Sequence, residues 1–137
     1  MASTFPLELV TPEKLLFSEE IRMVRAPGAL GSFGVLAHHA PMLAELQIGM
    51  IKVIRADGSE ELMATSGGFL QVSRDKVIIL ADTAELSTEI DIARAELALD
   101  RARQMLSIPG ELSAEEVKQM MERAHNRIHV AQLGNSQ

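Results

Sequence analysis

The spacing of hydrophobic residues changes once along this chain, near Glu85, and that change restricts the possible folds more than any other feature. Before it, apolar and polar residues alternate, as they do over residues 5–9. After it, apolar residues recur every three or four positions. Alternation is typical of half-buried strands, whereas the longer spacing is typical of amphipathic helices. The sequence therefore predicts an α+β protein with a β unit over residues 1–86 and a helical unit over residues 87–137.

The β unit consists of short apolar segments separated by turn signals. Asp57 and Gly58 form a hairpin-turn dipeptide, and two further turns are indicated at residues 67–68 and 74–75. Short strands at this spacing predict an antiparallel β-sandwich or barrel. The continuous apolar run at residues 77–81 predicts a strand that is buried on both faces.

The helical unit predicts two helices that pack against each other. The first carries an apolar stripe, and Pro109 with Gly110 ends it. In the second, Ser113 and Glu116 have the spacing of a capping box. The stripes comprise Ile92, Ala95, Leu99, Ala102 and Leu106 in the first helix and Val117, Met121, Ala124, Ile128 and Ala131 in the second. A hairpin with so many alanines buries little area, so we expect it to dock on the sandwich, on a ligand or on another protein.

Composition excludes several function classes. The chain has 13 basic and 19 acidic residues, a net charge of −6, without a basic stripe, so nucleic acid is not an expected partner. The absence of cysteine excludes disulfides, thiolate catalysis and cysteine-ligated zinc. No apolar segment approaches the length of a membrane span, and the first residues do not have the pattern of a secretory signal. We expect any membrane association to come through a partner.

Some motifs permit both a functional and a structural interpretation. Gly28, Gly31 and Gly34 lack the Lys-Ser/Thr ending of a phosphate loop, which favours turns and bulges. The adjacent His38 and His39 have no evident third ligand or nucleophile, so a structural or interface role is favoured. His125 and His129 have the i, i+4 spacing of a helical zinc pair, again without a third ligand. The sequence therefore predicts neither a metal site nor catalytic residues.

Four arginines on the two predicted helices form the group of residues that most strongly suggests a binding site. They are Arg94, Arg101, Arg123 and Arg127. The guanidinium fork suits phosphate oxygens, so these side chains suggest a polyphosphate site. Asp91 could accept hydrogen bonds from an adenine amino group or from ribose hydroxyls. In the alternative interpretation Asp91 is the third position of a capping box begun by Thr88, and it pairs with Arg94.

Several ordered motifs resemble those of the epsilon subunits of bacterial F-type ATP synthases. They are GSFGVLAHHAPML at residues 31–43, SGGFLQV at residues 66–72 and LADTAE at residues 80–85. The resemblance extends almost from end to end, beginning with the segment LELVTP at residues 7–12. The one departure is His38, where the family more often has Asn or a small residue.

The resemblance implies a sandwich of about ten strands on the central stalk, where it binds the gamma subunit and the c-ring. The contact candidates in the signature loop are Gly31, Phe33, His38, His39 and Pro41. The helical hairpin of such subunits lies folded on the sandwich or extends toward the alpha and beta subunits, where it impedes ATP hydrolysis. The expected location is the cytoplasmic face of the bacterial plasma membrane.

The resemblance also implies ATP as a regulatory ligand, through a motif of the form Ile-Asp-x-x-Arg-Ala. Its four fixed positions are Ile90, Asp91, Arg94 and Ala95. The supporting positions are Glu85, Arg101, Arg123 and Arg127. A requirement for Mg²⁺ is left open. The alternative is the same rotor subunit without nucleotide binding, in which the hairpin arginines contact only the catalytic subunits.

Overall fold

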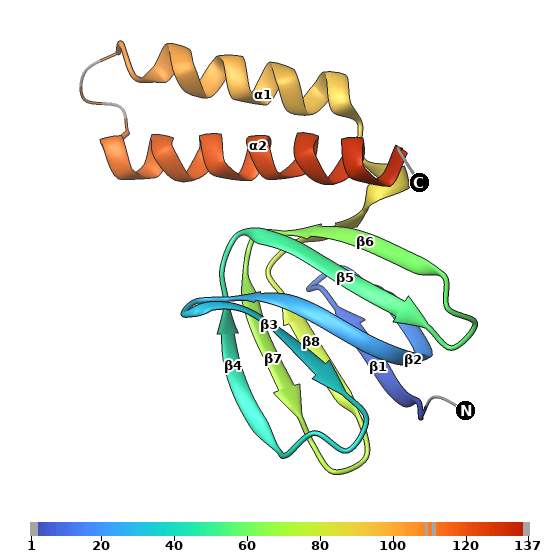
Figure 1. The fold of residues 1–137 in the computed structure, drawn as a ribbon. Helices are drawn as coiled ribbons and strands as arrows, with labels where there is room; N and C mark the ends of the chain where they lie inside the picture. Colours follow the sequence, from blue (N-terminus) through green and yellow to red (C-terminus); the bar gives the residue numbers. More distant parts are fainter. Residues whose placement is uncertain (1–2, 109, 111, 136–137) are drawn as a thin grey trace.

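The computed structural model describes residues 3–108, 110 and 112–135, and these contain nine strands, a 3₁₀ turn and two helices (Figure 1). The strands are β1 (Phe5–Val10), β2 (Leu15–Gly28), β3 (Gly31–Leu36), β4 (Met42–Leu46), β5 (Gly49–Arg55), β6 (Glu60–Thr65), β7 (Gly68–Val72), β8 (Val77–Ala81) and β9 (Ala84–Leu86). The helical elements are η1 (Ser87–Glu89), α1 (Ile92–Met105) and α2 (Ala114–Asn135). The predicted α+β architecture is confirmed.

The sheet is mixed, which corrects the antiparallel prediction. Its order is β1-β8-β7-β4-β2-β5-β6-β9, with β3 beside β2 and with β1 also paired to β2. β1 is antiparallel to β2 but parallel to β8. Parallel neighbours need a long connection, and strands β2 to β7 provide it here. The described residues form nine strands rather than about ten, because the 14-residue β2 pairs with β1 in its first half and with β3 and β5 in its second.

The sandwich core follows the predicted alternation. In β1, Phe5, Leu7 and Leu9 are buried and the residues between them are half-buried. In β8, Ile79 is fully buried, but Leu80 is 54% exposed and lies opposite the exposed Phe69 of β7. The prediction that residues 77–81 are buried on both faces is therefore wrong. The outer face of β8 remains open because the described part of the chain places no second layer over Leu80.

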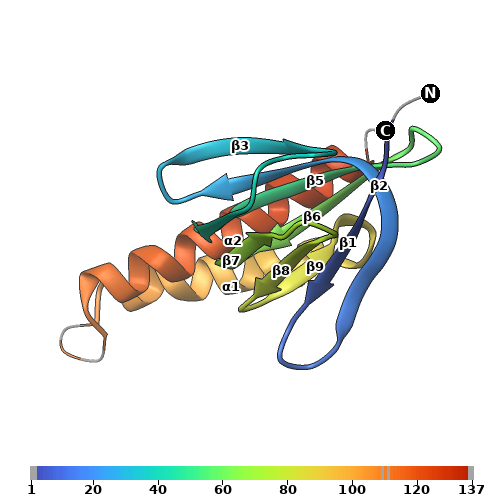
Figure 2. The ribbon, with the colours of Figure 1, turned by 90° about the horizontal axis from the view of Figure 1, so that it is seen from below.

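The hairpin lies against one side of the sandwich, with α2 packed on β5 and β6 and α1 packed on α2 (Figures 1 and 2). In both views the helix ends nearest the α1–α2 connection project beyond the strands. Only the second half of α2 therefore docks. None of the helices in the described ranges is both long and apolar enough to cross a membrane.

The helical stripes are largely confirmed. Both helices bury most of the predicted residues, namely Ala95, Leu99, Ala102, Val117, Ala124 and Ala131. Leu106 is 56% exposed, because α1 ends at Met105 and the stripe ends with it. Val130 is fully buried although it lies outside the predicted stripe, because it faces the sandwich rather than α1. Pro109 lies outside the described residues.

The two helix starts differ in how well the sequence predicted them. The hydroxyl of Ser113 accepts a hydrogen bond from the backbone N–H of Glu116 at 3.1 Å, as a capping box requires. In α1 the N-cap is Asp91, whose carboxylate accepts from the backbone N–H of Arg94 at 3.0 Å. The interpretation with Thr88 as N-cap is wrong, because Ile90 is extended (φ −74°, ψ 125°) and separates η1 from α1.

Candidate functional site

An ion pair between Glu85 of β9 and Arg127 of α2 marks the place where the two units meet. Arg127 donates from Nε to one carboxylate oxygen of Glu85 at 2.6 Å and from a terminal nitrogen to the other at 3.2 Å. The Glu85 side chain is 38% exposed and the Arg127 side chain is 24% exposed. Such bidentate Arg–carboxylate pairs fix the relative orientation of the two side chains as well as stabilising their contact. The pair therefore ties the hairpin to the last strand of the sandwich.

A cavity of about 540 Å³ opens beside this ion pair. Its walls come from the β1–β2 turn, from the end of the sandwich at β8 and β9, and from the hairpin. The lining residues are Thr11, Pro12, Glu13, Lys14, Asp82, Thr83, Ala84, Glu85, Arg94 and Arg127. This volume falls within the ~300–1,000 Å³ range of small-molecule sites. The cavity exists only while the hairpin is docked, because both units contribute walls.

A smaller cavity of about 40 Å³ adjoins the first and shares Thr83, Glu85 and Arg127 with it. It also reaches Arg123, which precedes Arg127 by one helical turn. The structure thus gathers Glu85, Arg94, Arg123 and Arg127 around two connected spaces.

The cations around these spaces are not equally available. Arg127 is held by Glu85, whereas no ion pair is recorded for Arg94 or Arg123 within the described ranges. An uncommitted guanidinium retains its full set of donors for an incoming anion. Around these spaces, Arg94 and Arg123 are therefore the guanidinium groups that Glu85 does not hold.

The remaining predicted nucleotide residues do not line either cavity. Ile90 is 8% exposed and packs with Val130 and Ala131 against the sandwich. Ala95 is fully buried within the hairpin, and Asp91 caps α1. Arg101 is exposed on α1, two turns beyond Arg94. Three of these four residues thus shape the start and the packing of the hairpin in the structure described.

The sequence did not predict one contact between hairpin and sandwich and one contact between α2 and η1. Asn126 donates from its side-chain amide to the carbonyl of Gly49 at 2.7 Å and lies 3.5 Å from the carbonyl of Thr65. Gly134 lies so close to η1 that a Cβ at this position would be 2.6 Å from Cβ of Ser87. A single polar residue and a single glycine within a helix carry no periodic signal. Neither contact was therefore visible in the pattern.

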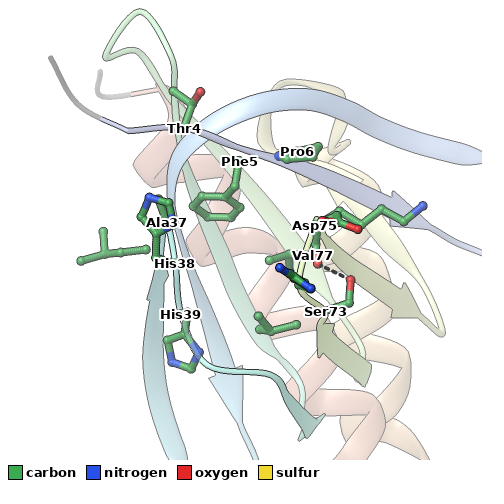
Figure 3. A pocket seen from close by; sticks show the side chains of 13 residues that line it. Thr4, Phe5, Pro6, Ala37, His38, His39, Ser73, Asp75 and Val77 are labelled. Atoms are coloured by element: carbon green, nitrogen blue, oxygen red, sulfur yellow. Dashed lines mark hydrogen bonds between the residues drawn. The ribbon is translucent and has the colours of Figure 1, made fainter.

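The partner-contact candidates lie on two separate surfaces. Gly31 and Phe33 line a groove between the β2–β3 hairpin and β4. His38 and His39 line a different cavity of about 240 Å³, and Figure 3 shows them among its lining residues. Pro41 is exposed in the β3–β4 connection.

His38 has an unusual backbone conformation. Its φ of 65° is in the left-handed region, which Asn and Gly adopt more readily than most residues. The resemblance noted in the sequence implies Asn or a small residue here, and Asn or Gly would adopt this backbone readily. The ring nitrogen Nδ1 of the neighbouring His39 lies 2.7 Å from the carbonyl oxygen of Ala40.

The glycine motif and the helical histidine pair occupy a turn and an exposed part of α2, respectively. Gly28 lies at the β2–β3 turn, where a Cβ would be 2.6 Å from the carbonyl oxygen of Gly31 and 2.8 Å from the ring of Phe33. His125 and His129 are both exposed on α2. Within the described ranges, no three His, Cys, Asp or Glu side chains are grouped as metal ligands would be.

Comparison with known proteins decides the family. The model of the ATP synthase delta/epsilon chain beta-sandwich domain matches residues 4–87. The chain belongs to the ATP synthase delta/epsilon family. It is 43% identical over 133 residues to the ATP synthase epsilon chain of Desulforamulus reducens, covering 96% of this chain and 100% of the relative. It is 44% identical over 133 residues to that of Geotalea uraniireducens, covering 96% of each chain.

Two chains of solved structures share the fold. A chain of the Euglena gracilis mitochondrial ATP synthase OSCP/F1/c-ring assembly superposes with a TM-score of 0.79 at 23% identity, over 98% of this chain and 82% of that one. A chain of the Tetrahymena thermophila mitochondrial ATP synthase central stalk and c-ring gives a TM-score of 0.59 at 16% identity, over 96% of both chains. At these identities the likeness concerns the fold alone.

Proposed function

We propose that the chain is a non-catalytic rotor subunit in the central stalk of a proton-translocating F-type ATP synthase. Family membership and relatives named ATP synthase epsilon chain along almost the whole length support this role. In it, the sandwich joins the gamma subunit to the c-ring, and the hairpin restrains ATP hydrolysis when it extends toward the alpha and beta subunits. The complex holds the chain at the cytoplasmic face of the bacterial plasma membrane.

The finer part of the proposal is that ATP binds the docked hairpin as a regulatory ligand. The observation that carries it is the convergence of Arg94 and Arg127 with Glu85 on one cavity of about 540 Å³. Arg94, Arg101, Arg123 and Arg127 would hold phosphate oxygens. Glu85 and Asp91 would orient the nucleoside. No residue is assigned to ATP cleavage, because a sensor needs differential binding rather than transition-state stabilisation.

The cavity also supplies the coupling between ATP and the hairpin. A ligand that binds only the docked state stabilises that state by RT ln(1 + [ATP]/Kd). At an ATP concentration ten times Kd this amounts to about 1.4 kcal/mol, a shift of about tenfold in population. When ATP falls, the hairpin is released to extend and to limit wasteful hydrolysis.

Isothermal titration of the full chain with ATP, ADP and GTP tests the ATP assignment. We expect one-to-one binding that prefers ATP and that Arg94→Ala weakens by about tenfold or more, because a charge-assisted hydrogen bond is lost. The matched control is Arg103→Ala, which removes an exposed arginine of α1 that pairs with Asp100 and does not line the cavity. Equal weakening by both variants would contradict a specific role for Arg94.

The contribution of Asp91 needs a substitution that preserves the helix cap. Asp91→Ala removes the N-cap of α1 as well as the carboxylate, so a loss of binding would have two causes. Asn caps helices about as well as Asp. We therefore expect Asp91→Asn to isolate the charge, and unchanged ATP affinity in this variant would remove Asp91 from the site.

A second candidate is the same rotor subunit without nucleotide binding. The exposure of Arg94, Arg101 and Arg123 favours it, because these arginines are equally placed to meet acidic surface on the catalytic subunits. An absence of heat up to millimolar ATP would favour this candidate and leave the rotor assignment intact.

A further inference from the structure

We propose that Lys14, in the β1–β2 turn, is a phosphate-binding residue that the sandwich contributes to the ATP site, so that the nucleotide bridges the two units. This inference rests on the proposed ATP site. It adds a residue that lies 76 positions before Ile90, the first residue of the Ile-Asp-x-x-Arg-Ala motif. Lys14 lines the same cavity as Arg94 and Arg127.

The charges around the cavity show why a further cation is needed. Its lining contains the cations Lys14, Arg94 and Arg127 and the anions Glu13, Asp82 and Glu85. Glu85 already neutralises Arg127 through two hydrogen bonds. Of the two arginines in this lining, Arg94 is then the one that Glu85 does not hold, and Glu13 and Asp82 lie in the same lining. Lys14 is the remaining cation of this lining, and no ion pair of its ammonium group is recorded within the described residues.

The turn that carries Lys14 is well defined. The backbone N–H of Thr11 donates to the carbonyl of Lys14 at 2.9 Å, and the N–H of Lys14 donates to the hydroxyl of Thr11 at 3.3 Å. Pro12 occupies the second position, where its fixed φ favours a β-turn. The backbone of Lys14 is thus positioned before a ligand arrives, so binding has to order only the side chain.

The position of Lys14 gives ATP a contact on the sandwich as well as contacts on the hairpin. Arg94 and Arg127 belong to the helices, whereas Lys14 belongs to the body on which they dock. A nucleotide held from both sides loses contacts if the hairpin leaves. The differential affinity that a population shift requires would follow from this arrangement.

Titration of the full chain with ATP, comparing Lys14→Ala with Lys14→Arg, tests the inference. We expect Lys14→Ala to weaken ATP binding by about tenfold and Lys14→Arg to retain most of the affinity, since charge rather than shape is needed. The matched control is Lys118→Ala, which removes an exposed lysine of α2 outside the cavity lining. The melting temperature without ATP should be the same in wild type and Lys14→Ala, because Lys14 has no recorded ion pair to lose.

The outcomes separate this inference from the proposed function. If Arg94→Ala weakens ATP binding but Lys14→Ala does not, the bridge is wrong and the hairpin site stands. If Lys14→Ala lowers the melting temperature without ATP and Lys14→Arg fails to restore affinity, the role of Lys14 is structural and the inference is overturned. If the wild-type chain does not bind ATP, the ATP site and the bridge fail together, whereas the rotor assignment stands.

Discussion

The interior of the sandwich and the contact between hairpin and sandwich are built differently. Large side chains such as Leu7, Ile21 and Ile79 are fully buried in the sandwich core. We call the contact between the units the seam, and its buried apolar residues are Leu62, Ala64, Ile90, Val130 and Ala131. Burial stabilises in proportion to apolar area, so the core dominates the free energy of unfolding. On the proposed function, we expect the seam to open without unfolding of the sandwich.

Polar contacts supply much of the specificity of the seam. Arg127 pairs with Glu85, and Asn126 donates to the carbonyl of Gly49. Water can replace such hydrogen bonds when the hairpin leaves, which limits their net contribution to about 0.5–1.5 kcal/mol each. The sandwich is thus held by extensive apolar burial, whereas the seam combines a small apolar cluster with a few directional contacts. This difference is what the proposed release of the hairpin would require.

The largest expected change in the free energy of unfolding comes from a substitution in β8. Ile79→Ala removes a fully buried side chain and should lower the free energy of unfolding by about 2–5 kcal/mol. Leu80→Ala, its control on the same strand, removes a side chain that is 54% exposed and should change stability by no more than about 0.5 kcal/mol. Urea denaturation measures both. Similar losses would mean that both faces of β8 are covered.

A second experiment places one methyl group in the seam. Gly134→Ala adds a Cβ that would lie 2.6 Å from Cβ of Ser87, and such overpacking costs about 1–3 kcal/mol. Alanine also favours the helix by about 1 kcal/mol over glycine, so the helix should hold while its docking weakens. Hydrogen exchange of the α2 amides without ATP measures the opening.

The double variant Gly134→Ala with Ser87→Gly gives the matched control for this contact. Removing the Ser87 side chain restores the space, so docking should largely recover. If the double variant opens as readily as Gly134→Ala alone, the Gly134–Ser87 contact does not limit docking, and the seam is looser than the structure indicates.

The smallest expected effect concerns Asn126. Asn126→Ala removes the donor to the carbonyl of Gly49 and should favour opening of the hairpin by about 1 kcal/mol. Gln119→Ala, on an exposed part of α2, is the control and should leave opening unchanged. Hydrogen exchange of α2 and urea denaturation of the sandwich, measured together, sharpen the comparison. A loss confined to the sandwich would contradict the assignment of Asn126 to the seam.

Much of the fold was predictable because it depends on neighbours in sequence. The strand and helix periods, the Ser113 cap and the buried faces of both helices follow from spacing within a few turns or residues. The start of α1 was not predicted correctly, since Thr88 and Asp91 are both acceptable caps. Only the extended backbone at Ile90 selects Asp91.

The sequence indicated which types of residue the candidate site would contain, but not how they are arranged in space. The sequence showed that Arg94 and Arg127 lie on adjacent helices, and the structure brings both to one cavity. The sequence did not show that Glu85 forms an ion pair with Arg127 or that Lys14 lines the same cavity. These residues come from distant parts of the chain. Pattern analysis compares positions within one element and contains no information about which elements meet.

The sequence by itself determined the secondary structure and the division between strands and helices, because local spacing sets which side chains share a face. The tertiary structure alone decided that β8 lies parallel to β1 and leaves Leu80 exposed. It also decided that Asn126 contacts β5 and that Gly134 packs against η1. These features depend on surfaces brought together over long separations, such as the 77 positions between Gly49 and Asn126. Contacts of that kind are fixed by packing and hydrogen-bond geometry in three dimensions.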